Sequence, residues 1–214
     1  MSAPLFDEAG ASRALNRGGR RGEILAEATR LFARHGFNGV GMRAIADAVG
    51  VQTSSLYHYF PAKTDILYEI VLDSTAAFID GRLPVLAGTT SPAATLREVF
   101  HEHILYFHEN REEEAVALRE MRELEAARYK EVNDMRRGYQ DAICKVVVAG
   151  QKSGQFRVDD PMVATLACLG LLNSVNDWYR IEGRLSIEQV AQAYSSMAVD
   201  RILGARKSPR RRST

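Results

Sequence analysis

Apolar side chains recur at helical spacing along most of the chain. In the first clear instance, Ile24, Ala28, Leu31 and Phe32 follow the i, i+4, i+7, i+8 pattern of one buried stripe, and Gly36 stands where a helix would end. The same periodicity continues, and the predicted helices cover residues 20–35, 42–48, 52–58, 63–81, 93–109, 112–124, 126–153, 160–181 and 186–204. This pattern indicates a chain built from helices.

Turn-forming residues separate the predicted helices. The stretch 83–92 contains two prolines and is typical of a connection, while Ser186 and Gln189 have the spacing of a capping box. No run of four or more residues alternates as a strand would. We therefore expect an all-α fold, in which a small N-terminal unit of short helices is joined to a larger helical bundle.

Composition is that of an ordinary globular protein. Of 214 residues, 46% are apolar and 26% are charged, and the net charge is +1. The charge is unevenly distributed, because residues 20–63 carry six basic against three acidic side chains, whereas residues 98–141 are acidic. A basic segment in a nearly neutral chain is typical of contact with a polyanion.

Cysteine usage and hydropathy indicate the compartment. Cys144 and Cys168 form no CxxC pair, which argues against a disulfide scaffold or a zinc site and fits a reducing environment. The longest nearly apolar stretch, 162–172, is much shorter than the ~20 residues that span a bilayer. The N-terminus lacks the apolar run of a signal peptide. We expect a cytoplasmic protein with no membrane partner.

Signals for catalysis or metal binding are weak. His101 and His103 diverge by about 200° on a helix, and His101 and His108 lie about 10 Å apart along it, so neither pair can close on one ion. The chain has neither a GxSxG elbow nor the spacing of a nucleotide-binding glycine loop. We expect no metal, no cofactor and no enzymatic activity.

Two short predicted helices, 42–48 and 52–58, have the length of a helix-turn-helix and are joined through Gly50. In such a unit the second helix lies in the major groove of DNA. Its outer face here carries hydroxyl, amide, phenol and imidazole groups and no carboxylate, so it can hydrogen-bond to bases and phosphates. Composition alone fits a polar surface helix of an ordinary bundle equally well.

The order of residues over 20–80 is more specific than their composition. It runs Arg21-x-x-Ile24-x-x-x-Ala28-x-x-Leu31-Phe32-x-x-x-Gly36-Phe37, then Met42-Arg43-x-Ile45-Ala46-x-x-x-Gly50-Val51, then Ser55-Leu56-Tyr57-His58-Tyr59-Phe60-x-x-Lys63-x-x-Ile66-Leu67. This segment resembles the DNA-binding domain of the TetR family of bacterial transcriptional regulators. Over the rest of the chain the resemblance is mainly architectural.

The resemblance implies which side chains meet DNA. Those expected at bases or adjoining phosphates are Arg43, Thr53, Ser54 and Tyr57. Those expected to hold the DNA backbone are Ser55, His58, Tyr59 and Lys63. One position departs from the family, because Gly41 stands where members often have a Ser or Thr that could bond a phosphate. Glycine can still cap a helix there.

Four segments follow from these patterns. We expect a flexible arm over 1–19, a helix-turn-helix DNA-binding domain over 20–80, a ligand-binding and dimerisation domain over 81–205, and a basic disordered tail over 206–214. The tail could add non-specific DNA affinity through counterion release.

The predicted bundle is rich in aromatic and soft side chains that suit an adaptable cavity. Those we expect at a ligand are Tyr106, Phe107, Met121, Tyr139 and Trp178, with His103, Asn176 and Arg180 at its polar end. Trp178 fits a dimer core equally well. In the family the last two long helices pair with those of a second copy, which implies that Leu169 and Leu172 lie at a dimer interface.

These expectations combine into a homodimeric, ligand-responsive transcriptional repressor. It would bind a palindromic DNA operator and be released by a small hydrophobic effector. Residues 173–180 and 183–186 resemble members associated with lipid, steroid or acyl-CoA catabolism, which suggests that class of effector. The alternative is a constitutive DNA-binding or architectural protein whose bundle only dimerises. An enzyme is a more distant alternative.

Overall fold

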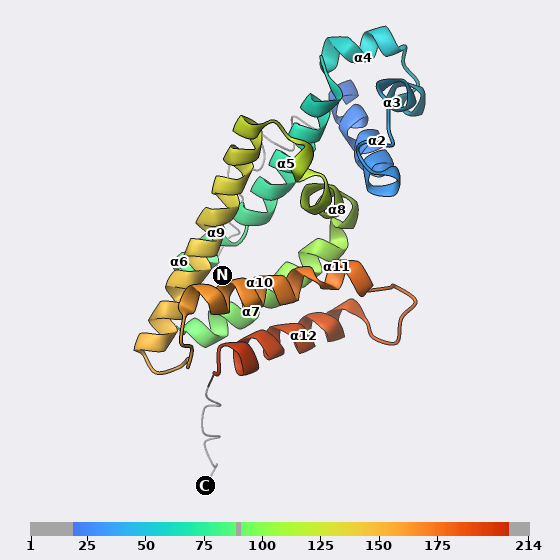
Figure 1. The fold of residues 1–214 in the computed structure, drawn as a ribbon. Helices are drawn as coiled ribbons and strands as arrows, with labels where there is room; N and C mark the ends of the chain where they lie inside the picture. The colour runs from blue at the N-terminus through green and yellow to red at the C-terminus, as the bar shows by residue number, and fades with distance from the viewer. Residues whose placement is uncertain (1–18, 89–90, 206–214) are drawn as a thin grey trace, which may run out of the picture. The chain divides into compact units, whose positions relative to one another are not determined.

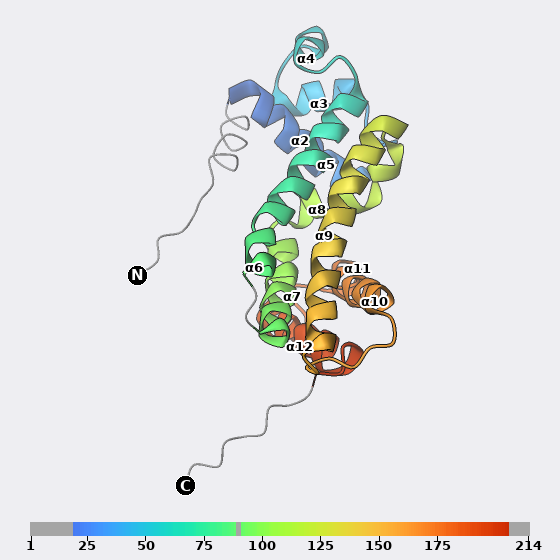
Figure 2. The same ribbon diagram turned by 90° about the vertical axis from the view of Figure 1, so that its left-hand side faces the viewer.

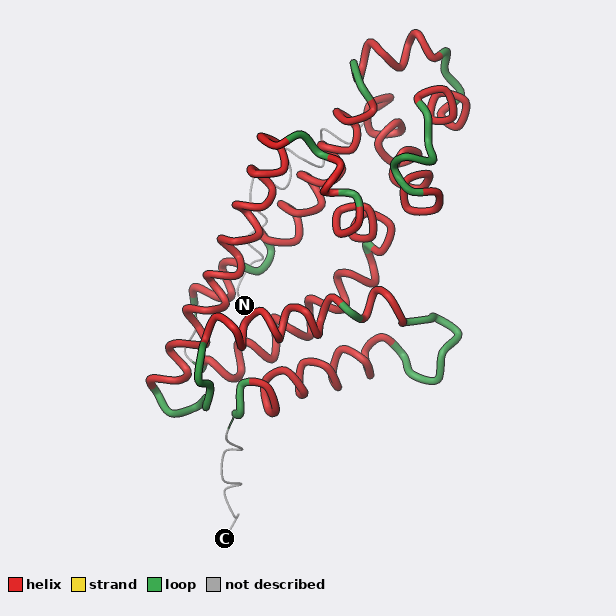
Figure 3. Tube along the Cα trace, viewed as in Figure 1, coloured by secondary structure: helices red, strands yellow, loops and turns green. Residues whose placement is uncertain are grey.

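The fold is given by a computed structural model, which describes residues 19–88 and 91–205 (Figure 1). The helices are α2 (Gly19–His35), α3 (Met42–Val49), α4 (Thr53–Tyr59), α5 (Lys63–Asp80), α6 (Leu83–Ala87), α7 (Pro92–Glu109), α8 (Arg111–Arg119), α9 (Ala126–Lys152), α10 (Pro161–Asn173), α11 (Val175–Trp178) and α12 (Ile187–Met197). A 3₁₀ turn, η1 (Met121–Glu123), and a π-helical turn, η2 (Ala198–Ile202), complete them. These ranges contain no strand, which confirms the predicted all-α fold (Figure 3).

The described helices group into two compact units. Of the described residues, the N-terminal unit contains 19–80 together with Asn110–Arg136, and the C-terminal unit contains 81–88, 91–109 and 137–205. The sequence predicted a single boundary near residue 80. The segment 110–136 joins the N-terminal unit because its apolar side chains, among them Val116 and Val132, are buried in that unit's core.

Helices α2 to α5, α8 and the first half of α9 form the N-terminal unit. Phe32 and Leu56 are buried in its core. Gly36 directly follows the last residue of α2 and Gly50 that of α3, and both adopt the left-handed conformation that favours glycine. These two predicted glycine stops are therefore confirmed. Helix α8 packs against α2 and α5 (Figures 1 and 2).

Helices α6, α7, the second half of α9 and α10 to α12 form the C-terminal unit. Helices α7 and α12 pack side by side, and the Arg97 guanidinium donates to Asp200 at 2.7 Å next to that seam. The capping box predicted at Ser186 and Gln189 is present at the start of α12. None of the helices within residues 19–88 and 91–205 is long and apolar enough to cross a membrane.

Three predicted segments are divided differently in the structure. The connection 83–92 includes the short helix α6, which begins with Pro84 in its first turn, where proline is tolerated. The predicted helix 112–124 becomes α8 and η1. The predicted helix 160–181 breaks at Ser174, whose hydroxyl donates to the Leu171 carbonyl and so competes with the helix ladder. The expected arm over 1–19 and the expected tail lie outside the described residues, apart from Gly19.

Candidate DNA-binding surface and bundle sites

Helices α3 and α4 form the helix-turn-helix that the spacing predicted. Leu56 of α4 and the following Phe60 are buried, at 0% and 1% exposure. The other side of α4 faces solvent: Ser54, Tyr57, His58 and Tyr59 are exposed, and Thr53 and Ser55 are half-buried. The exposed face of this helix therefore carries polar hydrogen-bonding groups and no acid, as a surface that reads DNA requires.

Arg43 lies on α3 and extends into solvent. Its side chain is 88% exposed, and it pairs with Asp47, one turn further on, at 3.9 Å. An exposed pair at this distance contributes little free energy, so the guanidinium can exchange the carboxylate for a phosphate. Gly41 precedes α3 as its N-cap and contributes no side-chain cap, in keeping with the missing hydroxyl noted in the sequence.

Lys63, which the resemblance places at the DNA backbone, also makes contacts inside the protein. Its ammonium donates to the carbonyls of Phe37 and Val40, each at 2.7 Å, and lies 4.0 Å from the centre of the Phe37 ring. Two of its three N–H groups are thus used inside the protein, where they tie the α2–α3 connection to the start of α5. Sequence could not show this because it does not reveal which carbonyls face the lysine.

Arg21 was part of the motif that carries the family resemblance, but the sequence indicated no role for it. Its guanidinium donates to the Tyr59 carbonyl at 2.8 Å, pairs with Glu69 of α5 and lies 4.1 Å from the centre of the Phe60 ring. This one side chain from α2 therefore touches the end of α4 and the body of α5.

Helix α5 is also held by polar contacts from the segment 110–136. Asp65 pairs with Arg128 at 2.7 Å, and the Tyr68 hydroxyl donates to Glu131 at 2.7 Å, a hydrogen bond that raises the pKa of Tyr68. Further along, the Ser74 hydroxyl donates to the buried Glu114, also at 2.7 Å. These contacts fix α5 within the N-terminal unit along most of its length.

In the C-terminal unit, several of the predicted ligand residues lie around one buried arginine, Arg82. Its guanidinium donates to the Glu102 carbonyl at 2.9 Å and lies 4.6 Å from the centre of the Tyr106 ring. His103 and Tyr139 are both within its electrostatic influence. Sequence reasoning missed Arg82 because it stands at the edge of a segment interpreted as a connection.

Burial sets the ionisation of this cluster. His103 is 2% exposed, its Nε2 lies 2.9 Å from the Asn173 side-chain oxygen, and its ring packs on Phe107 with centroids 4.3 Å apart. Desolvation, helped by the positive Arg82, lowers the pKa of His103 to about 3. Desolvation also raises the pKa of Tyr139. Both side chains are therefore neutral at physiological pH.

The remaining predicted ligand residues differ in their burial and contacts. Met121 is buried in the core of the N-terminal unit, whereas the cluster around Arg82 belongs to the C-terminal unit. Trp178 is 44% exposed and packs on Tyr179 and Tyr194, and Arg180 is exposed and donates to neighbouring backbone carbonyls. Asn176 is half-buried on α11. Helical periodicity could not predict the positions of Asn176, Trp178 and Arg180, because the predicted helix 160–181 is broken at Ser174, ahead of all three.

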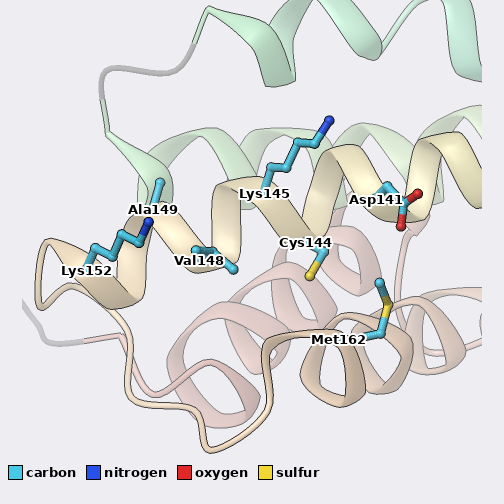
Figure 4. A pocket seen from close by; sticks show the side chains of 7 residues that line it. All are labelled: Asp141, Cys144, Lys145, Val148, Ala149, Lys152 and Met162. Carbon is cyan, nitrogen blue, oxygen red and sulfur yellow. The ribbon is translucent and has the colours of Figure 1, made fainter.

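An open hollow of about 480 Å³ lies on the C-terminal unit (Figure 4). Its lining residues are Asp141, Cys144, Lys145, Val148, Ala149, Lys152 and Met162. None of these was predicted at a ligand. In Figure 4, Cys144 and Val148 project from α9 on the side where Met162 of α10 lies, whereas Lys145 points away from it. The lining thus combines apolar side chains with the charged groups of Asp141, Lys145 and Lys152.

Helix α10 has two apolar faces. Leu169 and Leu172 were expected at a dimer interface, which requires an exposed surface on the single chain. They are instead 8% and 1% exposed, because they pack within their own unit. The opposite stripe is solvent-exposed and consists of Val163, Leu166, Ala167 and Gly170, with Val163 at 62% and Leu166 at 47% exposure. Periodicity alone cannot tell which face of a helix that is apolar all round is the internal one.

The helix-turn-helix, its acid-free outer face and the separate helical unit define a DNA-binding regulator. The model of the family "Bacterial regulatory proteins, tetR family" matches residues 24–70, and that of the "Tetracyclin repressor-like, C-terminal domain" matches residues 89–202. The chain belongs to the TetR family of bacterial transcriptional regulators. The predicted family and the expectation that the chain is not an enzyme are thereby confirmed.

Known relatives cover nearly the whole chain. It is 28% identical over 184 residues to the HTH-type transcriptional repressor KstR2 of Rhodococcus jostii (strain RHA1), covering 85% of this chain and 90% of the relative. The TetR family regulator PfmR of Thermus thermophilus superposes with a TM-score of 0.76 and 29% identity, over 86% of this chain and 99% of that one. AibR, in complex with isovaleryl coenzyme A and operator DNA, superposes with a TM-score of 0.79 and 26% identity, over 84% of this chain and 97% of that one.

Proposed function

We propose that the protein is a homodimeric repressor that binds a palindromic operator through α4 and leaves it when a hydrophobic acyl-CoA or a related lipid or steroid catabolite binds the C-terminal unit. The observation that carries this proposal is the outer face of α4, which combines exposed Tyr57 and His58 with the absence of any acid. Such a face can hydrogen-bond to base edges without repelling phosphates.

The exposed stripe of α10 supports the dimer. Val163 and Leu166 lie on a face without a charged residue, and a large exposed apolar patch typically marks an interface. A two-fold pair of such faces buries the same surface on both subunits, and it imposes the same symmetry on the operator. The two copies of α4 would then enter major grooves one helical turn apart, about 34–36 Å along the duplex.

The relatives support the class of effector. AibR was crystallised with isovaleryl coenzyme A, and KstR2 of Mycobacterium tuberculosis is described as a ketosteroid transcriptional regulator. In this chain, the buried cluster around Arg82 offers a cation beside apolar and aromatic groups, which suits a ligand with an apolar body and a polar head. A ligand that prefers the DNA-free conformation reduces DNA affinity by the ratio of its affinities for the two states.

Competition binding tests the proposal. A duplex enriched by the full-length protein from a randomised DNA pool serves as the operator, and isovaleryl-CoA, a long-chain acyl-CoA and a steroid acid-CoA are added in turn. We expect at least one of them to lower operator affinity and to raise the melting temperature of the free protein, because the two bindings are linked. Free coenzyme A is the control. If none of the three changes DNA affinity, the constitutive binder replaces the ligand-responsive repressor.

A further inference from the structure

The recognition helix α4 is too short to hold its own orientation. It has seven residues, and Leu56 is the single buried side chain within it. Its N-cap, Gln52, makes no side-chain cap hydrogen bond. Isolated helices need roughly 12–15 residues to be stable in water, so the direction in which α4 presents its outer face depends on contacts at its ends.

Arg21 makes the contact at the carboxyl end. The Tyr59 carbonyl that accepts its hydrogen bond at 2.8 Å is one of the last four of the helix, which have no partner within it. A cation at this end also complements the helix dipole. The guanidinium lies over the Phe60 ring, at 4.1 Å from its centre, and so covers the residue at which α4 stops.

Glu69 holds the guanidinium in place. It pairs with the second terminal nitrogen of Arg21 from the middle of α5, and both side chains are about a third exposed or less, at 34% and 28%. The planar fork of arginine can serve the carbonyl and the carboxylate at the same time, which a lysine could not do with the same geometry. A single ion pair thus links α2, α4 and α5.

We propose that Arg21, held by Glu69, is a positioning residue for sequence-specific DNA recognition, because it fixes the angle at which α4 presents Tyr57 and its neighbours to the base edges. The proposal rests on the DNA-binding role proposed for α4. This role differs from that of Arg43, whose side chain is 88% exposed and available to a phosphate. The nitrogens of Arg21 are instead turned toward the protein.

Charge-removing variants separate positioning from phosphate binding, since the two roles predict opposite effects at Glu69. Removing an acid near DNA strengthens binding if only electrostatics matters. If Glu69 holds Arg21, then Glu69→Gln weakens operator binding as Arg21→Gln does. Arg20→Gln is the matched control, because Arg20 is the preceding residue, carries the same charge and forms an exposed pair with Glu23.

The experiment measures binding of the full-length wild type, Arg21→Gln, Arg21→Lys, Glu69→Gln, the Arg21→Gln/Glu69→Gln double variant and Arg20→Gln. The probes are a duplex enriched by the wild type from a randomised pool and a shuffled duplex of the same composition. Measurements are made over a range of salt concentrations, at a temperature where circular dichroism shows every variant folded.

We expect Arg21→Gln and Glu69→Gln each to lower operator affinity by about tenfold while changing affinity for the shuffled duplex by less than about twofold. The double variant should be no weaker than either single one, because both changes break the same contact. Arg21→Lys, which keeps the charge but loses the fork, should fall between wild type and Arg21→Gln. The salt dependence of operator affinity should be the same for these variants as for the wild type.

Three results would overturn the inference. Arg21→Gln could weaken both duplexes equally and reduce the salt slope by about one, which marks a phosphate contact. Glu69→Gln could bind the operator more tightly. Arg20→Gln could cause the same loss as Arg21→Gln. A wild type that fails to discriminate the two duplexes would overturn the proposed function of α4 as well, so the two failures are distinguishable.

Discussion

At the scale of single residues, the buried histidine of the C-terminal unit couples folding to pH. His103 contacts Phe107 and Asn173 and feels the positive charge of Arg82, and its pKa of about 3 lies well below the 6.5 of an exposed imidazole. The unfolded chain therefore binds one more proton than the folded one between these two values. The contribution of His103 to stability is complete above about pH 6.5 and is lost as pH falls toward 3.

Replacing this histidine should flatten the acid side of the stability curve. We expect the free energy of unfolding of the wild type to fall between pH 6.5 and 5 more steeply than that of His103→Gln, by up to about 1.4 kcal/mol per pH unit. Glutamine cannot gain a proton but can still bond to Asn173. Urea unfolding at pH 7, 6 and 5 measures the difference, and parallel curves would show that His103 is not titrating on unfolding.

Whether the role of a residue could be predicted from the sequence depends on whether its contacts are local or join separate helices. The order of apolar and small residues around Gly36, Gly50 and Leu56 is a local property, so the helix-turn-helix was visible in the sequence. The bonds from Lys63 to the Phe37 and Val40 carbonyls, and that from Arg21 to the Tyr59 carbonyl, depend on how separate helices pack. Side-chain identity does not encode these partners.

At the scale of elements, the helices predicted over 63–81, 93–109 and 126–153 were close to those observed, whereas the helix predicted over 160–181 was not. Helix α10 has no charged residue from Pro161 to Asn173, so its pattern does not distinguish the stripe that faces its own unit from the one exposed to solvent. The break at Ser174 was missed because a serine hydroxyl can bond either to solvent or to the backbone.

The exposed stripe of α10 gives a direct test of the interface. Val163→Glu together with Leu166→Glu places two charges on a face that we expect to be buried between subunits, which disfavours association. Sedimentation velocity should show a monomer for this variant and a dimer for the wild type. Ala126→Glu combined with Ala127→Glu, which adds two charges to exposed positions at the start of α9 in the N-terminal unit, is the matched control. A double α10 variant that remains a dimer would place the interface elsewhere.

Helix α9 contains two glycines with opposite requirements. A methyl group at Gly138 would meet nothing within 4 Å, whereas a methyl group at Gly150 would overlap the ring of the buried Phe156. Gly138→Ala should therefore stabilise the protein by about 0.5–1 kcal/mol, through the lower entropy of the unfolded chain. Gly150→Ala should destabilise it by about 1–3 kcal/mol. Urea unfolding of both variants checks the prediction, and a shift of the same sign for the two would contradict it.

At the scale of the whole molecule, the helix-turn-helix and the cluster proposed to meet an effector belong to separate units. The helix-turn-helix, α5 and the segment 110–136 share one core, and the cluster around Arg82, the exposed stripe of α10 and the hollow of Figure 4 belong to the other. The sequence showed the first unit by a family motif. For the second unit, the ligand residues were predicted from amino-acid type alone. His103 and Tyr106 lie near Arg82, Met121 belongs to the core of the first unit, and Trp178 is exposed.

Helix α4 is proposed to read DNA sequence through its exposed polar face. The most direct measurement compares wild type and Tyr57→Ala on the duplex enriched by the wild type and on a shuffled duplex of the same composition. Tyr57 is 49% exposed and has no role in the core, so the variant should keep its fold. We expect it to lose about 1–3 kcal/mol on the enriched duplex and to bind the shuffled duplex nearly as before. Unchanged affinity for the enriched duplex, with the fold intact, would contradict the claim.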